Sequence, residues 1–201
     1  NQKNILEIGC GNGQMLEIFK KLSWNVCGIE RSDAVLESNN LNISNKNLDE
    51  YSDNIFDLVF LYNSFEHLHE PKKTLIKISE KVKKNGLILI TVPSHDSLQY
   101  KFGKNDWLHL DMPRHLNIFS HASFLKMIKD THNLKIVSIR SIGFDLEFYG
   151  WFQTIINRLS KRNNLLLKYL MNISSNKIIF FLSLIQFLIL FLPSLILTLF
   201  T

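Results

Sequence analysis

The segment ILEIGCGNGQMLEIF (residues 5–19) places three glycines at every second position between two apolar stretches. The apolar residues 4–8 predict a buried strand, and Met15, Leu16 and Phe19 recur at the spacing of a helix. Glycine has no Cβ atom, so the main chain between strand and helix can adopt positive φ and approach a ligand closely. Strand, glycine turn and helix in this order predict the opening βαβ unit of a parallel α/β fold.

The rest of the sequence continues to alternate strand-like and helical segments. A helix is expected to begin near Pro71 and to end before Gly86, and Ser120 is placed to cap another helix. This alternation predicts a parallel Rossmann-like sheet with helices on its faces. Strands are expected at 4–8, 25–30, 41–44 (weakly marked), 55–65, 87–93 and 134–144, with a short helix over 32–39.

The glycine spacing differs from that of a dinucleotide-binding loop, G-x-G-x-x-G/A, in which the third small residue lets helix pack on strand. In G-C-G-N-G-Q the third glycine comes one residue early, and Gln14 occupies the place of the small residue. Glu30, at the end of the second strand, can accept hydrogen bonds from both hydroxyls of a ribose. Arg31 supports an alternative, an NAD(P)-dependent oxidoreductase, because it could contact a 2′-phosphate. The spacing and Glu30 favour an adenosine ligand such as S-adenosylmethionine (SAM).

Several segments, in order, resemble the class I SAM-dependent methyltransferases: LEIGCGNG (6–13), the strand-end acid Glu30, FDLVFLYNSFEHLHEP (56–71), KNGLILITVP (84–93) and WLHLDMPRHLNIFSHASFLKMI (107–128). The last is similar to small-molecule methyltransferases of bacterial surface-glycan and quinone pathways. The resemblance covers about residues 4–145 and implies a Rossmann-like sheet with SAM as cofactor.

The resemblance also implies a SAM site made of residues that end or follow the first four strands. Without the other segments, a glycine turn could be only a turn, and Glu30 could be a solvated residue paired with Arg31. The implied contacts are Glu7, Gly9, Gly11 and Gly13 for the methionine part, Glu30 for the ribose, Asn47 and Leu48 for the adenine, and Asn63 for a main-chain contact near the amino group.

Three histidines, His67, His109 and His115, are candidates for a general base, because imidazole accepts a proton near neutral pH. His67 could instead orient its loop, and Asp111 with Arg114 could tie the loop of the other two histidines to the domain. In related quinone-pathway enzymes an acid occupies the position of Asn63 and, with a Glu-His pair, resembles a divalent-metal site. Since this chain has Asn63 there, we assign no metal.

The net charge of +5 belongs to the C-terminal quarter, where residues 151–201 hold five Lys/Arg and no acid. Residues 178–200 carry no charge over a length sufficient to span a bilayer, and 151–172 mix apolar and basic residues as an interfacial helix does. We therefore expect a methyltransferase domain over 1–150 and a hydrophobic helical segment over 151–201 that associates with a membrane, with the catalytic domain in the cytoplasm. The alternative is a substrate lid or buried hairpin. Both ends of the sequence suggest a chain trimmed from a longer one.

The expected activity is methyl transfer from SAM to a small-molecule or a glycan- or lipid-linked acceptor, more readily at oxygen than at nitrogen or carbon. A membrane-tethered module that binds SAM without turnover is the second alternative. Nucleic acid is not an expected partner, because the folded domain has no basic stripe and its charges cancel.

Overall fold

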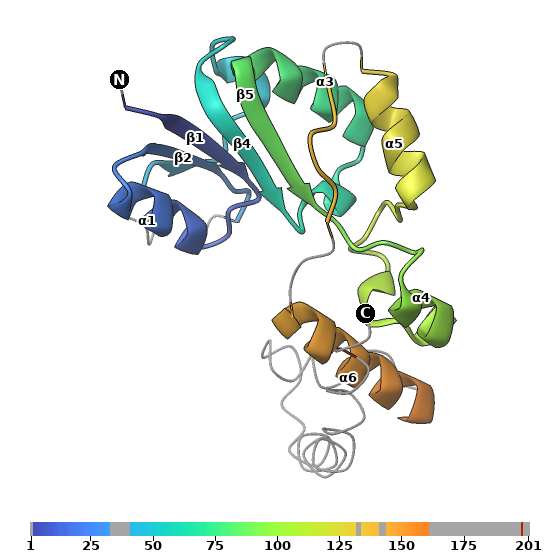
Figure 1. Cartoon of the computed structure of the whole chain (residues 1–201). Coiled ribbons are helices and arrows are strands. Elements are labelled where there is room, and N and C mark those ends of the chain that lie inside the picture. The colour runs from blue at the N-terminus through green and yellow to red at the C-terminus, as the bar shows by residue number, and fades with distance from the viewer. Residues whose placement is uncertain (1, 33–40, 132–133, 141–143, 161–197, 199–201) are drawn as a thin grey trace. The chain divides into compact units, whose positions relative to one another are not determined.

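The computed structural model describes residues 2–32, 41–131, 134–140, 144–160 and 198 (Figure 1). The chain divides into two compact units. The first unit comprises residues 1–93 and 122–136, and the second comprises residues 94–121 and those from 137 onward. The expected helix over 32–39 and the uncharged stretch 178–200 lie outside the described residues.

The first unit is built on a parallel five-stranded sheet in the order β3-β2-β1-β4-β5. This confirms the predicted parallel α/β fold, including the weakly marked third strand. The order reverses direction between β1 and β4, so the loops that leave these two strands lie beside each other at the carboxyl edge. The strands are β1 (Asn4–Ile8), β2 (Asn25–Ile29), β3 (Ile43–Ser44), β4 (Phe56–Tyr62) and β5 (Val82–Thr91).

Three helices of the described residues flank this sheet: α1 (Gln14–Lys21), α3 (Pro71–Lys81) and α5 (His121–Lys129). Because parallel crossovers are right-handed, α1 and α3 lie on opposite faces of the sheet, as Figure 1 shows. The central strands are therefore covered on both sides, and Leu6, Val59 and Leu61 are fully buried. Pro71 occupies the first turn of α3 and α5 begins directly after Ser120, as expected.

Helix α1 packs against β2 at Gly28. A Cβ atom added there would lie 2.6 Å from Cys10 Sγ, 2.8 Å from Leu16 Cδ1 and 3.0 Å from Ile43 Cγ1. These distances are shorter than any normal contact between carbon or sulfur atoms. Three side chains from the glycine loop, the helix and β3 therefore converge on a position that only glycine can occupy.

Two expectations about secondary structure were wrong. Gly86 does not follow a helix, because α3 ends at Lys81 and Val82 is already extended and opens β5. The register between β4 and β5 shifts at this point, and Asn85, at φ +67°, provides the left-handed residue of the irregularity. Residues 134–140 form no strand, and Phe144 begins helix α6 (Phe144–Ser160). Val137 and Ile139 are 79% and 54% exposed, and the segment pairs with no strand among the described residues.

The second unit packs α6 against α4 (Leu98–Gly103) and against the 3₁₀ turns that follow α4. Trp151 and Phe152 are 3% and 1% exposed. These two rings were expected in a helix at the membrane interface, but in the structure they are buried. The predicted domain boundary between residues 150 and 151 falls inside α6. Among the helices of the described residues, none is long and apolar enough to cross a bilayer.

Candidate functional site

The loop between β1 and α1 has a conformation that its glycines make possible. Gly9, Gly11 and Gly13 have φ angles of +73°, +51° and +79°, a region that other residues rarely adopt. The loop is anchored by main-chain bonds, since the N–H groups of Gly9 and Cys10 donate to the carbonyl of Ile29 at 2.8 and 3.2 Å. The alternating glycines therefore encode a fixed main-chain loop at the carboxyl edge of β1 and β2.

Gly9 and Gly11 serve different purposes within this loop. A Cβ atom on Gly9 would lie 2.5 Å from Ser64 Cβ, because the chain leaving β4 passes directly over this residue. Ser64 fixes that approach by donating from Oγ to the carbonyl of Ile8 at 2.6 Å. At Gly11, in contrast, an added Cβ would meet no atom within 4 Å. The loop is therefore closed against the protein at Gly9 and open at Gly11.

Glu30 is directed at the glycine loop. Its Oε2 accepts a hydrogen bond from the Gly11 N–H at 2.9 Å, and its Oε1 accepts from the N–H of Arg31 at 2.7 Å and of Ser32 at 3.2 Å. The structure thus brings the strand-end acid and the glycine loop together, as the sequence suggested. The contact with Arg31 is to its main chain and not to its guanidinium group.

Glu7 is a buried acid beneath the same loop, with 4% of its surface exposed. Its Oε2 has no hydrogen-bond partner among the described residues, and burial raises the pKa of the carboxyl group from 4.5 to about 7. An acceptor oxygen left open in this way suits a cationic group. The open space at Gly11 and this unsatisfied oxygen are the two features that fit the sequence-based expectation of SAM, which carries an ammonium and a sulfonium.

The remaining expected ligand contacts also follow strands. Asn63 comes directly after β4 with φ +47°, and its N–H donates to Thr91 Oγ1 at 3.0 Å and to the Thr91 carbonyl at 3.1 Å. A main-chain contact from Asn63 to a ligand would therefore use its carbonyl oxygen. Asn47 caps the 3₁₀ turn that begins at Leu48, and the Asn47 N–H donates to Glu50 Oε1 at 2.8 Å. Asn47 is exposed and Leu48 half-buried.

Ser64 is the residue that the sequence analysis missed. A serine one position after Asn63 carries no pattern that distinguishes it from any loop serine. Its importance depends on a contact with Ile8 across 56 residues, which only the folded sheet reveals.

His67 ends a 3₁₀ turn (Phe65–His67) at the carboxyl edge of β4 in the first unit. The turn is held by the His67 N–H, which donates to the carbonyl of Ser64 at 3.2 Å. Phe65 and Glu66 are buried, and His67 is half-buried. The position is compatible with either of the expected roles, a base or an orienting group.

His109 and His115 lie together in the second unit. His115 Nδ1 is 2.6 Å from the carbonyl of His109. A carbonyl only accepts, so Nδ1 carries the hydrogen and the lone pair of the neutral ring is on Nε2. Burial, and secondarily His115, lowers the pKa of His109 from 6.5 to about 4, against the opposing effect of Asp111. Asp111 Oδ2 lies 3.3 Å from Arg114 Nη1, so this pair joins two residues of the loop itself.

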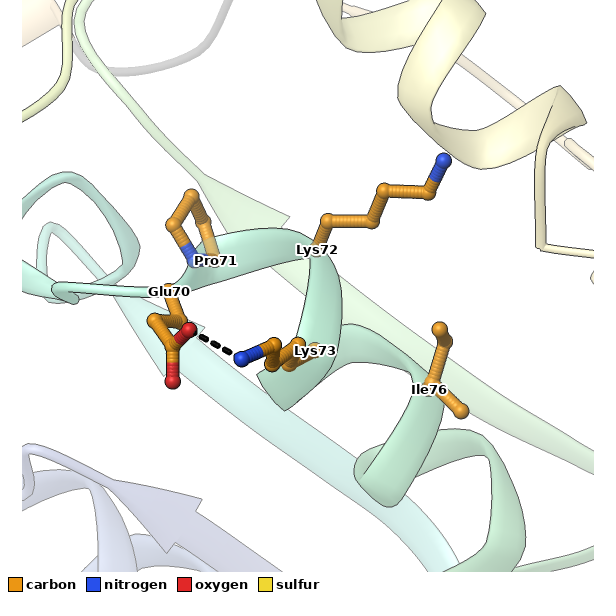
Figure 2. A pocket seen from close by; sticks show the side chains of 5 residues that line it. All are labelled: Glu70, Pro71, Lys72, Lys73 and Ile76. Atoms are coloured by element: carbon orange, nitrogen blue, oxygen red, sulfur yellow. Dashed lines mark hydrogen bonds and ion pairs between the residues drawn. The ribbon is translucent and has the colours of Figure 1, made fainter.

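A separate depression of about 430 Å³ lies at the start of α3, lined by Glu70, Pro71, Lys72, Lys73 and Ile76 (Figure 2). Lys73 pairs with Glu70, and Lys72 extends toward α5, where its Nζ is 3.0 Å from Asp130 Oδ2. Each cation here is neutralised by an acid. None of the expected site residues lines this depression.

Comparison with known proteins gives a consistent result. Residues 1–139 match the family described as the methyltransferase domain. The chain is 23% identical over 165 residues to the ubiquinone biosynthesis O-methyltransferase of Rickettsia typhi, a match that covers 73% of this chain and 66% of the relative. It is 28% identical over 109 residues to the mitochondrial ubiquinone biosynthesis O-methyltransferase of Schizosaccharomyces pombe, which covers 48% of this chain and 40% of the relative.

A solved structure shares the fold. A SAM-dependent methyltransferase from Archaeoglobus fulgidus superposes with a TM-score of 0.56 and 18% identity, over 82% of this chain and 80% of that one.

Proposed function

The chain belongs to the methyltransferase domain family, and we propose that it methylates an oxygen atom of a small-molecule acceptor. Its fold is that of the class I methyltransferases, whose cofactor is SAM. SAM supplies a methyl group already activated by a sulfonium. Two relatives named as O-methyltransferases support oxygen as the acceptor atom. The family match leaves the NAD(P)-dependent alternative without support.

The observation that carries this proposal is the arrangement of Glu7, the glycine loop and Glu30. We assign the open acceptor oxygen of Glu7 to the ammonium of SAM, because a buried carboxylate gains most from a cationic partner. Gly11, with open space where a Cβ would be, lets the methionine part approach the main chain. Gly9 and Gly13 give the loop its shape.

The nucleoside half of the ligand is assigned to the two neighbouring strands. Glu30 accepts from the ribose hydroxyls, and the segment after β3, with Asn47 and Leu48, flanks the adenine. Asn63 contributes its carbonyl oxygen near the amino group. Support for these roles comes from the position of each residue at the carboxyl edge of the sheet, where ligands bind in open α/β folds.

A hydroxyl acceptor must lose its proton as it is methylated, and His115 has the properties required of the base. Its Nδ1 is committed to the His109 carbonyl, which leaves the lone pair of the neutral ring on Nε2. His109 is a weaker candidate, since a group with a pKa of about 4 takes up little proton near neutral pH. We assign His67 the role of orienting its loop.

The first test is calorimetric titration of SAM into the full chain and into a Glu30→Ala variant. We expect binding to weaken at least tenfold, roughly 1.4 kcal/mol. Glu17→Ala, at an exposed acid on α1, is the matched control and should bind as tightly as the parent. Equal affinity of the Glu30 variant would refute the ribose assignment.

The second test measures S-adenosylhomocysteine formation across phenolic, sugar and lipid-linked hydroxyl acceptors. His115→Gln should lose at least a hundredfold in turnover while retaining SAM affinity, and His109→Gln should lose less. If SAM binds but no acceptor yields product, the chain is better described as a SAM-binding module without turnover.

We further propose a lipid- or glycan-linked acceptor at the cytoplasmic face of a membrane. The support is the sequence after residue 150, which carries five cations and no acid, together with the uncharged stretch 178–200. Sedimentation of the full-length protein without detergent tests this, since a protein that stays in the soluble fraction would contradict it.

A further inference from the structure

The second unit exposes a high proportion of its large apolar side chains. Of the fourteen large apolar residues with exposed surfaces among those described, eight belong to this unit, which holds the smaller part of the described chain. On α4, Leu98 and Phe102 are 50% and 40% exposed and, four residues apart, share one side of the helix. At the end of α6, Leu159 is 65% exposed.

Cations lie on the same segments as these apolar residues. Arg158 donates from Nη1 to the carbonyl of Phe102, and its guanidinium carbon lies 4.9 Å from the centre of the Phe102 ring. This contact joins α4 to the end of α6. Lys101 and Lys104 are exposed on the same short segment. We call the set Leu98, Lys101, Phe102, Lys104, Arg158 and Leu159 the α4–α6 face.

Acidic residues are absent from the segments that build this face, 97–105 and 148–160. Two acids, Asp96 and Asp106, flank α4. Asp96 accepts from the His121 N–H at 2.7 Å and lies 3.2 Å from His95 Nδ1, and Asp106 is half-buried where α6 contacts its carbonyl through Asn157. The residues that make up the α4–α6 face thus include three cations and no acid.

Helix α1 provides an instructive contrast. Ile18 on this helix and Leu22, which caps its end, are 52% and 63% exposed beside Lys20 and Lys21. Glu17, however, is exposed one residue before Ile18. Exposed apolar residues beside lysines are thus not unusual in this protein. The α4–α6 face is distinguished by the absence of acids and by its continuity with the acid-free sequence that follows α6.

We propose that the α4–α6 face docks on the surface of an anionic phospholipid bilayer. Leu98, Phe102 and Leu159 would enter the boundary between headgroups and acyl chains, as the apolar side of an interfacial helix does. Lys101, Lys104 and Arg158 would lie at the lipid phosphates, which attract cations near the surface. This proposal rests on the membrane association proposed above and adds anionic phospholipid as its partner. It also places a contact with the lipid outside the uncharged stretch 178–200.

The test places an environment-sensitive fluorophore on the face in the full chain. Leu98→Cys, in a Cys27→Ser background that leaves the buried Cys10 in place, is labelled and mixed with vesicles of phosphatidylcholine with 30% phosphatidylglycerol. We expect a blue-shifted, stronger emission that a lipid-borne quencher reduces. Leu22→Cys, labelled in the same background, is the matched control on α1 and should remain accessible to aqueous iodide.

A charge-reversal arm tests the lipid preference. The affinity for vesicles is followed by the fluorophore at residue 98. The double variant Lys101→Glu, Lys104→Glu should bind at least tenfold more weakly, whereas Lys20→Glu, Lys21→Glu should change the affinity less than threefold. The proposal is overturned if the probe at 98 stays in water while the protein is on vesicles, if neutral vesicles bind equally well, or if no vesicle binds. SAM titration of the same samples reports separately on the proposed function, which can succeed or fail independently.

Discussion

The two units of this protein are stabilised by different kinds of group, main-chain groups in the first and side chains in the second. Around the glycine loop, the contacts are made largely by main-chain groups: the Ile29 carbonyl accepts from two amides, and the Gly11 amide donates to Glu30. In the second unit, buried side chains make the contacts. Thr154 Oγ1 accepts from the Leu108 N–H at 3.1 Å, and Asn157 Nδ2 donates to the Asp106 carbonyl at 2.9 Å.

This difference determines what each unit tolerates. A loop held by main-chain groups depends on the absence of side chains at its glycines, and it tolerates many substitutions at neighbouring residues. A unit closed by buried polar side chains depends on the identity of each partner, since a buried group that loses its hydrogen bond costs about 1–3 kcal/mol. Substitutions that add atoms should therefore be most harmful in the first unit, and substitutions that exchange atoms should matter more in the second.

The largest expected effect is that of Gly9→Ala. The new methyl group would lie 2.5 Å from Ser64 Cβ at a φ of +73°, so both contact and conformation are unfavourable. We expect a loss of about 4 kcal/mol in the free energy of unfolding and no measurable SAM binding. Gly11→Ala is the control, since it shares the positive φ without the contact and should cost about 1 kcal/mol. Equal costs would show that conformation alone governs the loop. Urea denaturation measures both.

The next effect is the pH dependence that Glu7 imposes. Its pKa rises from 4.5 to about 7 on folding, so between these values the folded state holds a proton that the unfolded state has lost. Glu7 should therefore contribute a loss of stability of about 3 kcal/mol as pH rises from 4.5 to 7, whereas His109, whose pKa is lowered from 6.5 to about 4, contributes an opposing gain over much of the same range. The difference in stability between the parent and Glu7→Gln should therefore show the Glu7 contribution alone, because His109 titrates in both proteins.

SAM affinity should follow the opposite course. It should increase as pH rises through about 7, because the ionised carboxylate is the form that attracts an ammonium. In Glu7→Gln the affinity should be lower and flat with pH over this range. A pH profile unchanged by the substitution would contradict the assignment of Glu7.

In the second unit, Gly103→Ala should cost about 2 kcal/mol, because the added Cβ would lie 2.4 Å from Thr154 Cγ2. Gly103 has a φ of −78°, so no backbone strain contributes. Thr154→Ser removes Cγ2 but keeps the hydroxyl that accepts from Leu108, and it should restore most of the stability in the double variant. Thermal unfolding of the four proteins in this cycle gives the coupling. Without rescue, the cost of Gly103→Ala arises elsewhere.

The smallest effect is expected at a surface ion pair. Lys72 and Asp130 join α3 to α5 at 3.0 Å, but their side chains are 52% and 45% exposed. Lys72→Met should change stability by less than about 0.5 kcal/mol, since solvent screens such pairs. A larger loss in urea denaturation would mean that this contact holds α5 in place.

Much of the first unit could be predicted from the sequence, because its signals are local. The glycines at alternate positions, the strand-end Glu30 and the apolar run of β4 each identify their own structure within a few residues. The sequence placed Glu30 at the end of the second strand, and the structure adds that its carboxylate accepts from the Gly11 N–H.

The features that escaped prediction depend on distant parts of the chain. The segment 134–140 is rich in the β-branched residues typical of strands, but a strand also needs a neighbour with which to pair. Gly86 resembles a helix terminator, yet its place is set by the irregular pairing of β4 with β5. The sequence predicted Trp151 and Phe152 at a membrane interface, but both rings are buried. On the same helix, Thr154 and Asn157 bind main-chain groups about 50 residues earlier in the chain, a contact that the local sequence does not indicate.

The close packing at Gly28 has a consequence for how related sequences can diverge. Cys10, Leu16 and Ile43 share the space that a methyl group at position 28 would need. A lineage that acquires alanine there must first have smaller side chains at one or more of the other three positions. Positions 10, 16, 28 and 43 should therefore covary as a group, with their combined side-chain volume changing less than the volume at any one of them.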